Sequence, residues 1–148
     1  MYGRILIPVD GSPASDRAVA EAVELARCLE SSVLFLFAMD TAAIAREGVT
    51  NFDEALTALR DQGEQIVTRA RATAESAGVH AETLLTEGPA AEVILLESDK
   101  HDLVVMSSHG KTFMERVLYG SVTEAVLHHI ARPLLILQCR PTEAKVPP

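Results

Sequence analysis

The sequence has little of what marks several common classes of protein. It contains only two cysteines, Cys28 and Cys139, which lie far apart, and it has no C-x-x-C and no Cys/His pair at zinc spacing. These absences argue against a disulfide framework and against a structural zinc site. We therefore interpret both cysteines as small buried apolar residues.

Basic residues are also in the minority: the sequence has 13 Lys and Arg but 21 Asp and Glu, which gives a net charge of −8. Proteins that bind nucleic acid usually show the opposite balance, so we expect no nucleic acid and no anionic membrane surface as a partner. No apolar stretch reaches 18 residues, and the first apolar run is too short for a signal peptide. We expect a cytoplasmic protein with no membrane contact.

The length and apolar content indicate one folded domain. A chain of 148 residues with 48% hydrophobic residues can build a core without a disulfide or a metal. We expect the domain to cover residues 1–140. The polar, proline-rich residues 141–148 are then a flexible tail.

Five short apolar runs, separated by helical patterns, predict the fold class. The runs cover residues 5–9, 33–39, 83–86, 103–106 and 134–137. Four of them hardly alternate, which is typical of strands buried on both faces of a parallel sheet, whereas the third is more polar and fits an edge. We predict an α/β fold, an open parallel sheet with helices on both faces.

The predicted helices begin at Ser12-Pro13, near Phe52, at Gly88-Pro89 and at Ser121. Ser12 is a good N-cap residue and Pro13 suits the first helical position. The core-facing residues of the first two helices are expected to be Ala18, Ala22, Leu25 and Leu29, and Phe52, Leu56, Leu59, Ile66 and Ala70. Residues 40–50 and 107–120 read as long irregular connections.

Two loops carry the candidate chemistry, one after the first strand and one after the fourth. In an open α/β sheet, ligands bind beyond the carboxyl ends of strands. Gly110 and Gly120 allow close approach of the backbone, and the helix after Gly120 offers a free N-terminus to a phosphate. Ser121 is either a plain N-cap, in a capping box with Glu124, or a phosphate contact.

Several enzyme motifs are absent. Gly110-Lys111-Thr112 resembles the end of a P-loop, but the glycine required five residues earlier is Val105. No G-x-G-x-x-G follows the first strand, and the sequence has no G-x-S-x-G and no H-E-x-x-H. We therefore assign no catalytic residue and no metal-ligating residue.

The opening Ile5–Ser12 segment and the segment from Met106 to Val126 together resemble the universal stress protein family. Members of that family that bind ATP carry the motif G-x2-G-x9-G-(S/T). Here Gly110 and Gly120 match the second and third glycines, with Ser121 directly after them. The resemblance runs from about Met1 to Cys139.

This resemblance implies a single-domain, Rossmann-like sheet of five parallel strands in the order 3-2-1-4-5. It also implies a site for ATP or a related adenine nucleotide such as AMP or ADP, with Mg²⁺ or Mn²⁺, and at most slow hydrolysis. By position, the residues that it implies as nucleotide-binding are Pro8, Val9, Asp10, Ala38, Met106, Ser107, His109, Gly110, Gly120, Ser121 and Val122. Asp10 would accept a hydrogen bond from ribose or help to place the cation, or it forms only an Asx-turn. His109 would lie near the phosphates, or it only holds its loop.

One residue departs from the family motif, because Ser107 replaces the first glycine. If that position requires a positive φ, serine is strained there by about 1 kcal/mol or more. If the position requires only clearance, a hydroxyl is small enough to be tolerated.

The resemblance, together with this departure, leaves two functions open. The first is a nucleotide-dependent sensor or partner-binding module of the stress response. The second is a nucleotide-independent homodimeric interaction protein whose site Ser107 closes. In both, the uncharged edge strand Leu134–Leu137 is expected to pair with a second copy of the chain.

Overall fold

The computed structural model describes residues 1–109 and 119–138. Strand and helix alternate along most of the chain, as the apolar runs predicted. The elements are β1 (Arg4–Pro8), α1 (Pro13–Leu29), β2 (Ser32–Met39), α2 (Thr41–Arg46), α3 (Phe52–Ser76), β3 (Ala81–Glu87), α4 (Ala90–Ser98), β4 (Leu103–Ser107), α5 (Ser121–His129) and β5 (Leu134–Leu137).

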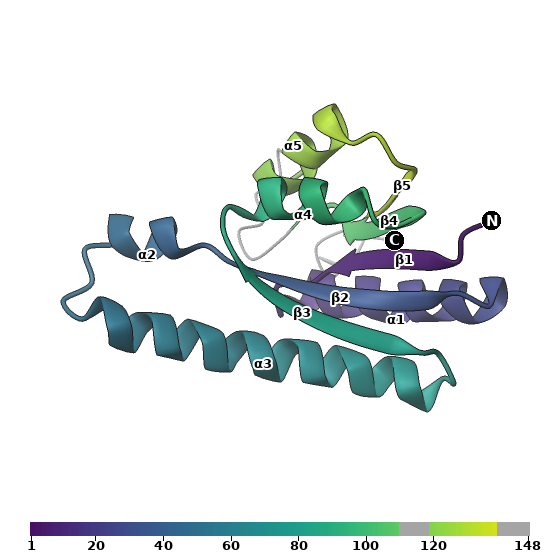
Figure 1. The fold of residues 1–148 in the computed structure, drawn as a ribbon, viewed down its shortest axis with the longest axis horizontal. Coiled ribbons are helices and arrows are strands. Elements are labelled where there is room, and N and C mark those ends of the chain that lie inside the picture. Colours follow the sequence, from purple (N-terminus) through teal and green to yellow (C-terminus); the bar gives the residue numbers. More distant parts are fainter. Residues whose placement is uncertain (110–118, 139–148) are drawn as a thin grey trace, which may run out of the picture.

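The sheet has five parallel strands in the order β3-β2-β1-β4-β5, which confirms the expected order and places the polar strand β3 at an edge. Helices α1 and α3 lie on one side of the sheet, and α4 and α5 lie on the other (Figure 1). The fold is therefore the predicted α/β class with helices on both faces.

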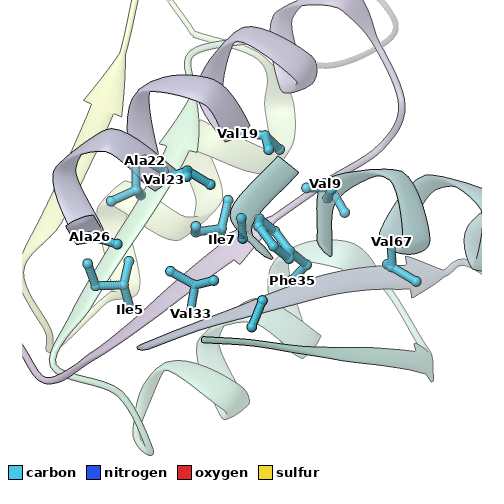
Figure 2. Packing of buried hydrophobic residues seen from close by; sticks show 14 of the residues in the cluster. Ile5, Ile7, Val9, Val19, Ala22, Val23, Ala26, Val33, Phe35 and Val67 are labelled. Carbon is cyan, nitrogen blue, oxygen red and sulfur yellow. The ribbon is translucent and has the colours of Figure 1, made fainter. Parts of the chain in front are cut away.

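Alternate strand residues supply two separate cores, and this explains why the strand sequences hardly alternate in polarity. Ile5, Ile7 and Phe35 face α1 and α3, where they pack against Val23 and Val67 (Figure 2). The residues between them in the sequence, such as Leu6 and Leu36, pack toward α4 and α5. Both faces of β1 and β2 thus bury apolar surface.

The structure corrects two expectations about the first connections. Residues 41–46 form a short helix, α2, whose N-cap Asp40 accepts a hydrogen bond from the Ala43 backbone N–H at 3.0 Å. Cys28 is exposed, because the buried residues of α1 run from Ser15 to Ala26 on the opposite side of the helix. Cys139 and the expected tail, residues 141–148, lie outside the described residues.

Among residues 1–109 and 119–138, no helix is both long enough and apolar enough to cross a bilayer.

Candidate nucleotide-binding crevice

A cavity of about 230 Å³ opens where β1, β2 and β4 end, between these strands and the first turns of α4 and α5. Strands β1 and β4 are neighbours, but the connection after β1 leads to β2 on one side of this pair, and the connection after β4 leads to β5 on the other side. The cavity thus lies at the switch point at which open α/β sheets bind ligands. Its volume is close to the lower end of the range of roughly 300–1,000 Å³ for small-molecule sites.

The residues that the sequence analysis predicted for the site lie together around this cavity. Every predicted site residue that the structure describes lines it, namely Pro8, Val9, Asp10, Ala38, Met106, Ser107, His109, Gly120, Ser121 and Val122. The remaining predicted residue, Gly110, lies outside the described residues. Segments from four parts of the chain therefore meet in one crevice.

Part of the cavity lining is apolar. Leu36 and Ala38 project from the same face of β2, Met106 comes from β4, and Ile94 comes from α4. Ala90, one turn before Ile94, completes this wall. Such a surface suits the flat, weakly polar face of an aromatic ring.

The N-terminus of α5 forms another part of the lining. Its N-cap residue is Gly120, with φ −66° and ψ 163°, and no side chain caps the helix among the described residues. The predicted capping box is thus wrong, because Ser121 is the first helical residue and its side chain is exposed. Uncapped first-turn N–H groups and the helix dipole favour an anion such as a phosphate.

The N-terminus of α1 differs, because its own side chains satisfy it. The hydroxyl of Ser12 accepts a hydrogen bond from the Ser15 N–H at 3.1 Å, and the hydroxyl of Ser15 accepts one from the Asp10 N–H at 3.1 Å. Asp10 Oδ1 accepts from the Ser12 N–H at 2.9 Å, which is the Asx-turn that the sequence allowed. The second carboxylate oxygen of Asp10 has no hydrogen-bond partner among the described residues. The crevice therefore presents a carboxylate on the β1 side and backbone donors on the α5 side.

Hydrogen bonds hold the start of α5 against the end of β4. The hydroxyl of Thr123 donates to the Ser107 carbonyl at 2.9 Å, and the Gly120 N–H donates to the Ser108 carbonyl at 2.7 Å. Thr123 is buried and was missed by the sequence analysis, although it lies only two residues after Ser121. These bonds set the distance between the strand and the uncapped helix.

Ser107 is unstrained in the backbone. Among the described residues other than glycine, only Glu30 has a positive φ. The alternative in which a positive φ strains the serine backbone is therefore wrong. The other alternative, in which the position requires only enough room for a side chain, still applies. The Ser107 hydroxyl donates to the His109 carbonyl at 2.8 Å.

His109 is 5% exposed and lines the cavity, and its Nδ1 lies 3.0 Å from the Ser108 hydroxyl. It therefore lies beside the crevice and also holds its own loop, so both interpretations of this residue fit the geometry.

The sequence analysis also missed Ser15, Leu36, Phe37, Ala90 and Ile94, which line the cavity as well. Leu36 lies two residues before Ala38 on the same strand face, so the strand period could have found it. Ala90 and Ile94 lie one turn apart on α4, but no predicted residue lies on that helix from which its period could be followed. Phe37 lies between Leu36 and Ala38 in the sequence, and its side chain belongs mainly to the core on the other face.

Metal ligands are scarce in the crevice. No group of three or more His, Cys, Asp or Glu side chains in residues 1–109 and 119–138 could hold a metal ion. Asp10 is the only acidic side chain among the described lining residues. A divalent cation fits here only if the phosphates of a nucleotide supply most of its ligands.

The fold and the crevice define a doubly wound α/β protein with a small-molecule cavity at its switch point. The model of the universal stress protein family matches residues 1–138, and the chain belongs to this family. Universal stress protein MJ0531 from Methanocaldococcus jannaschii is 33% identical over 143 residues, a match that covers 93% of this chain and 83% of that protein.

Solved structures agree in fold. The structure of the hypothetical protein MJ0577 superimposes with a TM-score of 0.82 at 23% identity, covering 96% of this chain and 99% of that one. A universal stress protein from Archaeoglobus fulgidus in complex with dAMP gives 0.68 at 18% identity, covering 91% and 97% of the two chains. A universal stress protein in complex with cAMP gives 0.64 at 22% identity, covering 93% and 97%.

Proposed function

We propose that this chain binds an adenine nucleotide, ATP or a relative such as AMP or ADP, in the crevice, and acts as a nucleotide-dependent module of a cytoplasmic stress response. The observation that carries the proposal is the pairing of an apolar wall with an uncapped helix N-terminus in one cavity. These two surfaces match the two ends of a nucleotide. Two structural neighbours hold adenine nucleotides, one cAMP and the other dAMP.

In this arrangement the base lies on the wall of Leu36, Ala38 and Ile94. The phosphates meet the first-turn N–H groups of Ser121 and Val122. Asp10 faces the sugar from β1, where its carboxylate accepts a ribose hydroxyl or joins the phosphates in holding Mg²⁺ or Mn²⁺. Each part of the ligand therefore meets a surface of matching polarity.

A nucleotide-independent homodimer is the second candidate, and Ser107 is the observation that favours it. This residue places a side chain in the cavity where the family motif has glycine. In either candidate we propose that β5 pairs with a second copy of the chain. Leu135 at this sheet edge is 38% exposed, and the strand carries no charge.

The test is titration calorimetry of AMP and ATP, each with and without Mg²⁺, into the nucleotide-free protein. We expect the wild type to bind with micromolar affinity. We expect Ala38→Leu to lose at least about tenfold in affinity, because the larger side chain fills the space beside the apolar wall. Ala20→Leu, on the exposed side of α1, is the matched control and should bind like the wild type. Absence of binding to a folded wild type would favour the nucleotide-independent dimer.

A further inference from the structure

Ser107 lines the crevice and connects its apolar wall to the start of α5. It directly follows Met106 of the apolar wall, and its carbonyl accepts the bond from Thr123 in the first turn of α5. Asp10 lines the same space from the loop after the neighbouring strand β1. A ligand that reaches from the apolar wall to the start of α5 therefore comes close to Ser107.

One of the three hydrogen-bonding positions of that hydroxyl is already used. A serine hydroxyl has one proton to donate and two lone pairs that accept. The proton of Ser107 is donated to the His109 carbonyl at 2.8 Å. The oxygen can therefore offer only its lone pairs to a ligand in the cavity.

Donors and acceptors are thus separated along the crevice. Backbone N–H donors lie at the start of α5, whereas two lining residues at the ends of β1 and β4 offer acceptors, the Asp10 carboxylate and the Ser107 oxygen. An anionic phosphate oxygen gains nothing from an acceptor, but a ligand hydroxyl donates to one. The part of a nucleotide that carries hydroxyl groups between its base and its phosphate is the ribose.

We propose that Ser107 is a specificity-determining residue that accepts a hydrogen bond from one ribose hydroxyl, so that the site prefers a ribonucleotide to the analogue lacking that hydroxyl. This inference rests on the proposed nucleotide-binding function. In this inference the serine contacts the nucleotide and does not close the site to it.

The experiment compares AMP, 2′-deoxy-AMP and 3′-deoxy-AMP by titration calorimetry on the wild type and on Ser107→Ala. We expect the wild type to bind AMP about three- to tenfold more tightly than one of the two deoxy analogues. Ser107→Ala should bind AMP and that analogue with equal affinity. Ser32→Ala is the matched control, because the Ser32 hydroxyl also donates to a carbonyl, that of Gly3, at the opposite end of the sheet. It should keep the wild-type preference.

Four results would overturn the inference while the nucleotide site stands. The wild type binds all three ligands equally, or Ser107→Ala keeps the full preference, loses affinity equally for all three ligands, or binds AMP more tightly. The last result would show that the hydroxyl obstructs the site. If the folded wild type binds none of the three ligands, the proposed function fails and the inference fails with it.

Discussion

At the scale of single residues, Gly63 decides how closely α3 can approach the sheet. A Cβ atom at this position would lie 2.5 Å from Cδ1 and 2.8 Å from Cε1 of Phe37. Phe37 is 4% exposed and has a wall of the candidate crevice on its other side. Glycine here is therefore a packing requirement, although it lowers the intrinsic helix propensity.

We predict that Gly63→Ala lowers the free energy of unfolding by about 1–2 kcal/mol. Overpacking a core costs about 1–3 kcal/mol, and the better helix propensity of alanine returns up to about 1 kcal/mol. Urea denaturation measures the difference. Gln62→Ala, at the exposed neighbouring position, is the control and should stay within about 0.5 kcal/mol of the wild type. A stabilised Gly63→Ala would show that α3 does not pack this tightly.

Predictions from the sequence were weakest for individual side chains at helix ends. Leu29 fits the apolar spacing of α1 but is 43% exposed, because the helix ends there beyond the sheet. Phe52 is 42% exposed for a related reason, since the buried residues of α3 begin only at Gly63. Spacing identifies a helix face but not how far along the helix the core extends.

At the scale of elements, the attachment of α5 to β4 determines the geometry of the crevice. The buried Thr123 hydroxyl and the Gly120 N–H both donate to carbonyls at the end of β4. Without the Thr123 bond, the Ser107 carbonyl loses its described partner, and the uncapped helix start can shift relative to the apolar wall.

We expect Thr123→Val, which keeps the shape of the side chain, to lower the free energy of unfolding by about 1–2 kcal/mol. We also expect it to weaken AMP binding. Thermal denaturation and calorimetry provide the two readouts. Thr57→Val is the control. It removes a threonine hydroxyl that also donates to a carbonyl, that of Asp53, but at an exposed site. Both readouts should therefore stay near the wild-type values. Equal losses in the two variants would contradict a special role for Thr123.

The strands and long helices could be predicted because each carries a continuous pattern. Helix α2 was missed, since its six residues are too few to show a period, although the Asp40 N-cap was present in the sequence. The start of α5 was predicted correctly but its cap was not. A serine in a capping-box pattern occupies the cap only if the backbone bends at that residue, and here the bend falls at Gly120.

At the scale of the whole molecule, the strand order determines what meets in the crevice and what is left at an edge. Apolar runs alone predicted parallel strands, and the family resemblance supplied their order, which the structure confirms. That order makes β1 and β4 neighbours and leaves β5 at the edge. The side chains on α4 that complete the crevice were not predictable from the motif, because the motif does not include that helix.

The same order leads to a prediction about assembly. We expect the wild type to be a dimer at micromolar concentration and Leu135→Glu to be a monomer, because a charge on β5 opposes pairing at an apolar edge. Light scattering distinguishes the two states. Leu29→Glu, which alters a similarly exposed leucine (43%) on α1, should remain dimeric. A monomeric wild type would contradict pairing through β5.

The central claim is that the crevice holds an adenine nucleotide, and the most direct measurement is of what the purified protein carries. The undialysed protein is denatured, the precipitate is removed, and the supernatant is analysed by nucleotide chromatography, with ATP titration of the stripped protein alongside. The account predicts adenine nucleotide at about one equivalent per chain, or micromolar binding of added ATP. No bound nucleotide and no heat of binding would contradict it and would indicate that Ser107 closes the site.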